Sequence, residues 1–314
     1  MSDDAMRLPS YPKVLALGTR GTERLLEGPV VVQEKIDGSQ LRVGIMGDGT
    51  LTFASRNQRL YPGAAGMFEP VVQHVLSRKE ALMGVHRCLG DTDLILYGEY
   101  LAKPRQNTLC YQRVPRGNLV LFDRAFGGLG VEHGDELITL TIADALGCEV
   151  VPTLHTGPAS MDDLKALLET EPLLGGPMIE GLVVKNYAEH IQLGSQVYPL
   201  FCKLVNDMFR EKHAANPDWK SGKAKEQEYY STYRTEARWL KAVQHLRDEG
   251  KLLDAPQDIG PLLRELSRDL LEEEGETIRE DLFRMHVKDL LRTAGRGLPE
   301  WYKERLAERV GEVG

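Results

Sequence analysis

A single lysine stands where a strand-like run of the sequence ends. Residues 30–34 are Val-Val-Val-Gln-Glu, and Lys35 is followed at once by Ile36, Asp37 and Gly38. β-Branched residues favour a buried strand, and an Asp-Gly pair is typical of a turn. A lysine in this position can be held rigidly with its amine facing a cleft. Because the reference pKa of lysine is about 10.4, a nucleophilic role requires burial or neighbouring cations that favour the free amine.

Taken alone, Lys35 would be interpreted as a solvated lysine in a hairpin, so the other residues at strand ends decide its role. A lysine that attacks the α-phosphate of a nucleotide places negative charge on phosphate oxygens, which cations and a divalent metal stabilise. Carboxylates can hold the metal and the ribose, and an aromatic ring can stack on a purine. The sequence offers Arg56, Lys185 and Lys203 as cations, Asp37, Glu99 and Glu180 as carboxylates, and Phe122 as the ring.

Short strands and helices must position these residues. Apolar runs, alternation of apolar and polar residues, and turn signals predict the strands, whereas helical spacing and capping residues predict the helices. The first three strands are expected to form a meander that brings Lys35 near Arg56. The predicted strands are residues 29–35, 41–45, 51–56, 94–101, 118–124, 149–154, 180–185 and 198–205, and the predicted helices among them are residues 68–85, 141–146 and 160–169.

The character of the chain changes after residue 207. Residues 208–221 are polar and basic, and everything beyond is helical in pattern, so we place a domain boundary between residues 212 and 213. The predicted helices of the second domain are residues 226–248, 260–273, 276–293 and 299–310.

Basic and aromatic residues alternate at the start of this helical domain. They could grip RNA, since basic side chains track phosphates and aromatic rings stack on bases. Equally, the rings could face a helical core while the basic side chains are solvated. The residues are Arg210, Lys212, Lys220, Lys223, Lys225, Arg234, Arg238 and Lys241, with Trp219, Tyr229, Tyr230, Tyr233 and Trp239.

Composition excludes several classes of protein. The chain has 314 residues, of which 42% are hydrophobic, so it can build two globular domains. A net charge of −8 argues against non-specific coating of nucleic acid, although a local basic cleft is compatible with it. The four cysteines form no C-x-x-C pair, which argues against a zinc site or a disulfide framework and fits a reducing cytoplasm. Neither a secretory signal nor a membrane span is expected.

The ordered motifs resemble those of the covalent nucleotidyltransferases, a superfamily of ATP-dependent RNA ligases, DNA ligases and mRNA capping enzymes. The resemblance covers about residues 30–212 and is closest to the RNA ligase 2-like branch, because residues 206–211 trail the last motif and the continuation is helical rather than an OB-fold. It implies an α+β fold: an antiparallel-sheet nucleotidyltransferase (ATP-grasp-like ligase) domain in residues 1–212, followed by an all-α domain in residues 213–314. The motifs are Lys35-Ile36-Asp37-Gly38, Ser55-Arg56, Gly98-Glu99, Phe122-Asp123, residues 180–185 and Lys203-Leu204-Val205.

The resemblance implies a three-step reaction. Lys35 would attack the α-phosphate of ATP and expel pyrophosphate, AMP would pass to the 5′-phosphate of an RNA end, and a 3′-hydroxyl would then seal the strand. The implied partners are RNA with these two ends and an end-healing kinase or phosphatase, in RNA repair or processing. By this resemblance, Glu34 would contact the adenine, Phe122 would stack on it, and Glu99 would contact the ribose. Arg56 would contact phosphate and ribose oxygens, Lys203 the α-phosphate, and Lys185 the nucleotide. Glu180, with Glu99, would bind Mg²⁺ or Mn²⁺, and Asp37 would orient the reacting groups.

One departure from the family pattern keeps alternatives open. The last motif usually offers two lysines separated by one residue, but Val205 stands where the second is expected. Lys185 or Lys212 could substitute. A catalytically silent module that binds nucleotide or RNA is therefore the alternative from another class, and DNA nick sealing and GTP-dependent capping are alternatives among enzymes.

Overall fold

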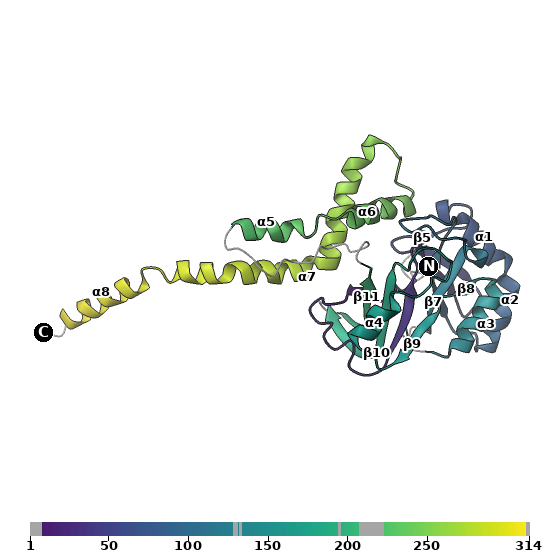
Figure 1. Ribbon diagram of the computed structural model, residues 1–314, viewed down its shortest axis with the longest axis horizontal. Helices are drawn as coiled ribbons and strands as arrows, with labels where there is room; N and C mark the ends of the chain where they lie inside the picture. The colour runs from purple at the N-terminus through teal and green to yellow at the C-terminus, as the bar shows by residue number, and fades with distance from the viewer. Residues whose placement is uncertain (1–7, 128–130, 132–133, 194–195, 207–222, 312–314) are drawn as a thin grey trace. The chain divides into compact units, whose positions relative to one another are not determined.

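The computed structural model describes residues 8–127, 131, 134–193, 196–206 and 223–311 (Figure 1). Its contacts divide the chain into two compact units, Met1–Leu266 and Ser267–Gly314. The predicted boundary between residues 212 and 213 lies outside the described residues and stays a prediction. The expected combination of mainly antiparallel sheets followed by helices is confirmed.

Two sheets form the core of the first unit (Figure 1). All neighbouring strands are antiparallel except β1 with β11 and β7 with β8. The first sheet has the order β1 (Val14–Ala16), β11 (Gln196–Val205), β10 (Gly181–Leu193), β2 (Val30–Lys35) and β9 (Thr153–Gly157). The second sheet has the order β5 (Arg59–Leu60), β4 (Leu51–Ser55), β3 (Ser39–Ile45), β6 (Leu94–Tyr100), β7 (Leu119–Phe126) and β8 (Glu149–Val150).

Helices cover the sheets and make up the end of the chain. Figure 1 shows α1, α2 and α3 together on one side of the second sheet. The helices of the sheet region are α1 (Glu69–Ser77), α2 (Lys79–Cys88), α3 (Glu136–Leu146) and α4 (Met161–Leu167). The later helices are α5 (Lys223–Ser231), α6 (Glu236–Asp248), α7 (Ile259–Ala294) and α8 (Leu298–Gly311). Among the described residues, none of these helices has both the length and the apolar composition to cross a membrane.

The expectation that the first three strands form one meander is wrong. β2 pairs with β10 and β9, whereas β3 pairs with β4 and β6, so residues 36–38 carry the chain from one sheet to the other. The crossing is tight at Gly38. A Cβ atom there would lie 2.7 Å from both the Glu99 Cγ atom and the Tyr100 carbonyl oxygen, so this position requires glycine. Lys35 consequently stands at the junction of the two sheets.

Four other predicted elements differ from the structure. The predicted helix at residues 68–85 is two helices, because Arg78 leaves helical geometry with φ −100° and ψ 6°. The predicted strand at residues 149–154 is divided between the two sheets at Pro152, which has no N–H to donate. The predicted break near Gly275 is absent, since a glycine inside a helix lowers stability without ending it. Residues 226–248 are likewise two helices, α5 and α6, and Thr235 caps the second.

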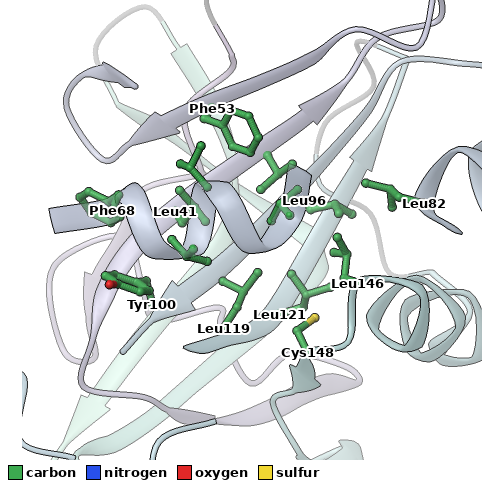
Figure 2. Packing of buried hydrophobic residues seen from close by; sticks show 14 of the residues in the cluster. Leu41, Phe53, Phe68, Leu82, Leu96, Tyr100, Leu119, Leu121, Leu146 and Cys148 are labelled. Carbon is green, nitrogen blue, oxygen red and sulfur yellow. The ribbon is translucent and has the colours of Figure 1, made fainter. Parts of the chain in front are cut away.

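The largest hydrophobic cluster lies between the second sheet and helices α1 to α3 (Figure 2). Alternation along β3 puts Leu41, Val43 and Ile45 on one face, where they are fully buried with Val72 of α1. A second cluster covers the outer face of the first sheet under α4, whose Leu164 is buried. Lys35 and Lys203 alternate with the residues of the second cluster, so they lie on the opposite face of the first sheet.

Leu121→Ala should lower the free energy of unfolding by about 2–5 kcal/mol, because it opens a cavity in the cluster of Figure 2, where Leu121 is 1% exposed. Leu137→Ala on α3 is the matched control, since Leu137 is 66% exposed. Urea unfolding followed by circular dichroism measures both variants. Equal midpoints for the two variants would contradict this account of the core.

Candidate active site

Lys35 ends β2 and is held by one carboxylate from the neighbouring strand connection. β2 and β10 are paired so that Lys35 lies opposite Gly181, which places Glu180 at the same end of the sheet. The Lys35 Nζ atom lies 2.7 Å from Glu180 Oε1 and 2.7 Å from Oε2. Both side chains are largely buried. The expected nucleophile and the expected metal ligand are thus in direct contact.

This contact fixes the protonation state of the lysine. Burial lowers the pKa of Lys35, but the charge of Glu180 and its hydrogen bonds outweigh burial, so the pKa lies above its ordinary value. The positive charge of Lys203 acts in the opposite direction. In this state Lys35 is therefore an ammonium ion, and it must lose a proton before it can act as a nucleophile.

Glu99 and Lys203 complete the charged group around Lys35. Val183 of β10 pairs with Gln33 on one side and with Lys203 on the other, so Lys203 and Lys35 project from the same face of the first sheet. Burial raises the pKa of Glu99 to about 8, a rise that the charge of Lys35 opposes and the charge of Glu180 increases. A buried carboxyl of this kind is stabilised as an anion when another cation arrives.

Asp37 joins the lysine segment, defined as residues 35–39, to the connection between β6 and β7. Its Oδ2 atom accepts hydrogen bonds from the backbone N–H groups of Thr108 at 2.8 Å and Leu109 at 2.6 Å. Its own N–H donates to the hydroxyl of Tyr111 at 2.8 Å, and Asn107 Nδ2 donates to the Gly38 carbonyl oxygen at 2.7 Å. These bonds give Asp37 a positioning role, and its catalytic role stays a prediction.

The connection between β6 and β7 packs against the lysine segment. In the structure, Gln106 is buried and donates to Ser39 Oγ at 3.0 Å, and Leu109 and Tyr111 pack in the cluster that includes Ile36. These supporting residues could not be found from the sequence, because their partners lie about 70 residues away in the chain.

Phe122 occupies a β-bulge. Tyr97 of β6 pairs with Asp123, and Gly98 pairs with Leu121, so Phe122 is the extra residue in β7. Its partly buried ring meets Tyr11 edge-on, with centroids 5.0 Å apart, and is stacked with Tyr97 at 6.5 Å. The bulge changes the direction in which the Phe122 ring projects, and this ring was expected to stack on a purine.

Lys185 is placed differently from the expectation that it binds the nucleotide. It lies opposite Val31, four residues along β2 from Lys35, which corresponds to about 13 Å. Its side chain is 1% exposed, and its Nζ atom donates to Asp123 Oδ2 at 2.9 Å and to the Phe122 carbonyl oxygen at 3.0 Å. The ammonium group is thus engaged inside the protein in this structure, and the contact of Lys185 with the nucleotide stays a prediction.

The same carboxylate of Asp123 ties the N-terminal segment to this buried pair. Tyr11 donates to Asp123 Oδ2 at 2.9 Å, and burial together with the charge of Asp123 raises the pKa of Tyr11 well above its ordinary value. The buried guanidinium of Arg42 also holds this segment, because it donates hydrogen bonds to the carbonyl oxygens of Leu8 and Pro9. No pattern in the sequence indicates a role for Tyr11, because an isolated tyrosine near a terminus has no diagnostic spacing.

Glu34 and Val205 also lie at the junction of the two sheets. Glu34 Oε2 accepts a hydrogen bond from the Leu173 N–H at 2.9 Å, whereas Oε1 is buried without a hydrogen-bond partner among the described residues. Burial raises the pKa of Glu34 to about 7, although the Leu173 hydrogen bond opposes the rise. Arg56 is exposed directly after β4, and Val205 packs with the cluster of Ile36. Lys212 lies outside the described residues.

The donors present fit a hard divalent cation. In the described part of the chain, no group of three or more histidine, cysteine, aspartate and glutamate side chains is arranged to hold a metal ion. Glu99 and Glu180 offer two carboxylates in a site whose buried negative charge is only partly balanced. Mg²⁺ and Mn²⁺ accept such oxygen ligands and complete their shells with water and substrate phosphates.

Asp123→Ala should lower the free energy of unfolding by about 3–5 kcal/mol, because it leaves the Lys185 ammonium buried without its carboxylate. Asp123→Leu combined with Lys185→Met removes both charges and should be less destabilising than the single change. Thermal and urea unfolding compare the two variants. A single variant as stable as the wild type would contradict the assignment of this ion pair.

Glu34→Gln should flatten the dependence of stability on pH. Because the folded-state pKa of about 7 exceeds the unfolded value near 4.5, the folded protein binds the proton more tightly, and stability falls as pH rises between these values. One such group contributes a slope of up to about 1.4 kcal/mol per pH unit. Urea midpoints from pH 4.5 to 7.5 test this, with Glu136→Gln at an exposed site as the control. An unchanged slope would contradict the burial of the Glu34 carboxyl.

Comparisons with known proteins complete the description of the site. The family model described as RNA ligase matches residues 28–200, more than half of the chain. A search of curated proteins gave no match. Among solved structures, a Naegleria gruberi RNA ligase variant with AMP and Mn has 16% identity and a TM-score of 0.45, covering 64% of this chain and 58% of that one. The same ligase with PPi has 16% identity and a TM-score of 0.44, covering 62% and 56%. The chain thus spans less than two thirds of these structures, and the match to the family model shows that it belongs to the RNA ligase family.

Proposed function

We propose that this protein is an ATP-dependent RNA ligase that joins 3′-hydroxyl and 5′-phosphate RNA ends through a lysyl-AMP and an adenylylated RNA, in RNA repair or processing. The observation that carries the proposal is the contact between Lys35 and Glu180 at the junction of the two sheets, with Glu99 and Lys203 beside it. The solved Naegleria gruberi RNA ligase variants contain ATP or AMP together with Mn, which supports ATP and a divalent metal for this chain also.

In the first step, the Lys35 Nζ atom forms a bond to the α-phosphorus of ATP, and the bond from that phosphorus to pyrophosphate breaks. Lys35 starts as an ammonium ion beside Glu180, so a proton must leave before the attack. The charge of Lys203 lowers the pKa of Lys35 and favours this loss. Lys203 then faces the negative charge that develops on the α-phosphate oxygens.

The nucleotide would be held from several sides. Glu34 offers an unpaired Oε1 atom to the amino edge of adenine, and Phe122 offers its ring for stacking. Arg56 would contact phosphate and ribose oxygens, and Glu99 the ribose hydroxyls. A divalent cation bound by Glu180 and Glu99 would neutralise phosphate charge when present.

In the second step, the AMP passes from Lys35 to the 5′-phosphate of an RNA end, which restores the free lysine. In the third step, a 3′-hydroxyl attacks the activated 5′-phosphate, and AMP leaves as the strand is sealed. Asp37 would orient the reacting groups through the lysine segment that its hydrogen bonds hold in place. The ends that this reaction consumes would come from an end-healing kinase or phosphatase.

The helical domain is proposed to contact RNA, with fewer candidate side chains than the sequence offered. The hydroxyl groups of Tyr229 and Tyr233 lie 3.1 Å apart in a buried position, and Arg238 is 1% exposed over the ring of Tyr233. By contrast, Tyr230 and Trp239 are each 47% exposed. Among the described residues, these two rings are the candidates for stacking on RNA bases, whereas the buried tyrosines and Arg238 belong to a helical core. Trp219 lies outside the described residues.

A catalytically silent nucleotide-binding or RNA-binding module is the second candidate function. The observation that favours it is Val205, which packs in the hydrophobic cluster of Ile36 and leaves Lys203 without the second lysine of the family pattern. The two candidates differ in one measurable property, which is the formation of a covalent bond between Lys35 and AMP.

The purified protein should gain the mass of one AMP when incubated with ATP and Mg²⁺ or Mn²⁺, and Lys35→Ala should abolish the gain because it removes the attacking amine. Lys165→Ala, at an exposed lysine of α4, is the matched control and should retain it. Intact-protein mass spectrometry detects the adduct. A 5′-phosphorylated RNA should discharge the adduct, and the equivalent DNA should do so much less.

An adduct that persists in Lys35→Ala would contradict the assignment of the nucleophile. A folded wild-type protein that binds ATP but forms no adduct would favour the silent module. Equal discharge by DNA would favour a polynucleotide ligase over an RNA ligase.

A further inference from the structure

The C-terminal end of helix α6 lies against the lysine segment. Gln244 Nε2 donates a hydrogen bond to the Gly38 carbonyl oxygen at 2.5 Å. One helical turn later, Asp248 Oδ1 accepts a hydrogen bond from the hydroxyl of Ser39 at 2.8 Å. Gln244 and Asp248 are about 200 positions from Gly38 and Ser39 in the chain. Gly38 is the last residue of the crossing between the sheets, and Ser39 follows it directly. A helix of the C-terminal region therefore supports the segment that carries Lys35.

The same helix end also touches the hairpin that carries Arg56. Gln58 Nε2 donates to the Asp248 carbonyl oxygen at 3.4 Å, and Asn57 Nδ2 donates to Glu249 Oε1 at 3.1 Å. Asn57 and Gln58 follow Arg56 directly in the turn between β4 and β5. The end of α6 thus bridges two segments that each hold one residue expected to bind the nucleotide.

Backbone hydrogen bonds close the C-terminal end of α6, so this end can act as a fixed support. Gly250 takes a left-handed conformation with φ 66°, its N–H donates to the Arg247 carbonyl oxygen, and the Lys251 N–H donates to that of Leu246. This pattern closes a helix firmly. Two acidic residues, Asp248 and Glu249, stand in the last turn, where the helix dipole disfavours negative charge. Local helix stability does not explain them, whereas their contacts across to Ser39 and Asn57 do.

The carboxylate of Asp248 also acts on Arg56 by charge. Burial raises the pKa of Asp248 to about 7, and the hydrogen bond from Ser39 and the positive charges of Arg247 and Arg56 oppose that rise. The charge of Arg56 is the smallest of these influences, but the contacts of the helix end with Asn57 and Gln58 hold the hairpin of Arg56 beside this carboxyl. Asp248 is therefore the group through which α6 can support both the lysine segment and that hairpin. Arg56 is exposed, so an electrostatic partner limits the directions in which its guanidinium can point.

We infer that Asp248 is a positioning residue for nucleotidyl transfer, which sets Arg56 and the lysine segment in the geometry that binds ATP. The inference rests on the proposed function and deepens it, because it makes α6 part of the nucleotide site rather than only of an RNA-binding domain. Asp248 does not touch the reacting atoms. Its effect passes through Arg56 by charge and through Ser39 by a hydrogen bond.

Two variants separate these two routes in the full-length chain. Asp248→Asn keeps an oxygen that accepts from Ser39 but loses the negative charge, and Ser39→Ala keeps the charge but loses the hydrogen bond. Glu236→Gln, at an exposed acidic residue in the first turn of α6, is the matched control. Equilibrium binding of a fluorescent ATP analogue and the single-turnover rate of adduct formation are measured for each variant.

Asp248→Asn should weaken binding of the analogue by about three- to tenfold, because a misdirected Arg56 loses part of a charge-assisted contact with phosphate. The decisive comparison is made in an Arg56→Ala background, where Asp248→Asn should cause no further loss of binding if it acts through Arg56. A thermal unfolding scan accompanies each measurement. A residue that only supports the fold would shift the unfolding midpoint and weaken binding equally in both backgrounds.

The inference is overturned if Asp248→Asn binds the analogue as the wild type does, or if its effect is the same with and without Arg56. The proposed function fails in a different way. A wild type that binds the analogue but forms no adduct contradicts the ligase proposal, while the binding ratios still decide the role of Asp248. A wild type that binds no ATP analogue overturns both.

Discussion

The crossing of the chain between two sheets within three residues is the constraint on which the rest of the site depends. It is possible only because Gly38 lacks a side chain and lets the backbone approach Glu99 and Tyr100. The crossing places Lys35 at the end of one sheet and Glu99, on β6, in the other, so the charged groups converge without any long loop. Asp37 and Asn107 on one side, and Gln244 on the other, hold the crossing in place by hydrogen bonds. A lysine held at such a junction loses little mobility when a ligand binds.

Two lysines on the same strand pair illustrate how neighbouring groups decide the chemistry of a side chain. Lys35 and Lys185 both project between the sheets, and both contact a carboxylate. Lys185 is enclosed by Asp123 and the rings of Tyr11, Phe122 and Phe201, so its ion pair anchors the layer beneath the expected purine position. Lys35 has partial access to solvent and a second cation nearby, so its pairing with Glu180 can be exchanged. Residue type alone does not distinguish them.

The sequence predicted most strands of the sheets and the residues that gather at Lys35, since β-branched runs and ordered motifs are local signals. Residues 30–35 and 94–100, for example, form the strands expected of them. The division of the strands between two sheets could not be predicted, because pairing of β2 with β10 depends on contacts between distant parts of the chain. The partner of Lys185 and the bulge at Phe122 were missed for the same reason. The sequence feature that marks Asp248 is weak. Asp248 and Glu249 are acidic residues at the C-terminal end of a helix, where the helix dipole disfavours negative charge.

The order of the strands has a consequence for how the protein is made. The second sheet draws its strands from residues 39–150, so it can form early from contacts of moderate sequence separation. The first sheet closes only when β10 and β11 are available, because Val14 pairs with Phe201 and Lys35 pairs with Gly181. Such distant pairings form slowly and late, because the entropy of closing a long loop is lost before the paired strands gain stabilising contacts. During synthesis on the ribosome, Lys35 therefore emerges long before Glu180 and Lys203, and a truncated product carries Lys35 without the charged groups that surround it in the folded protein.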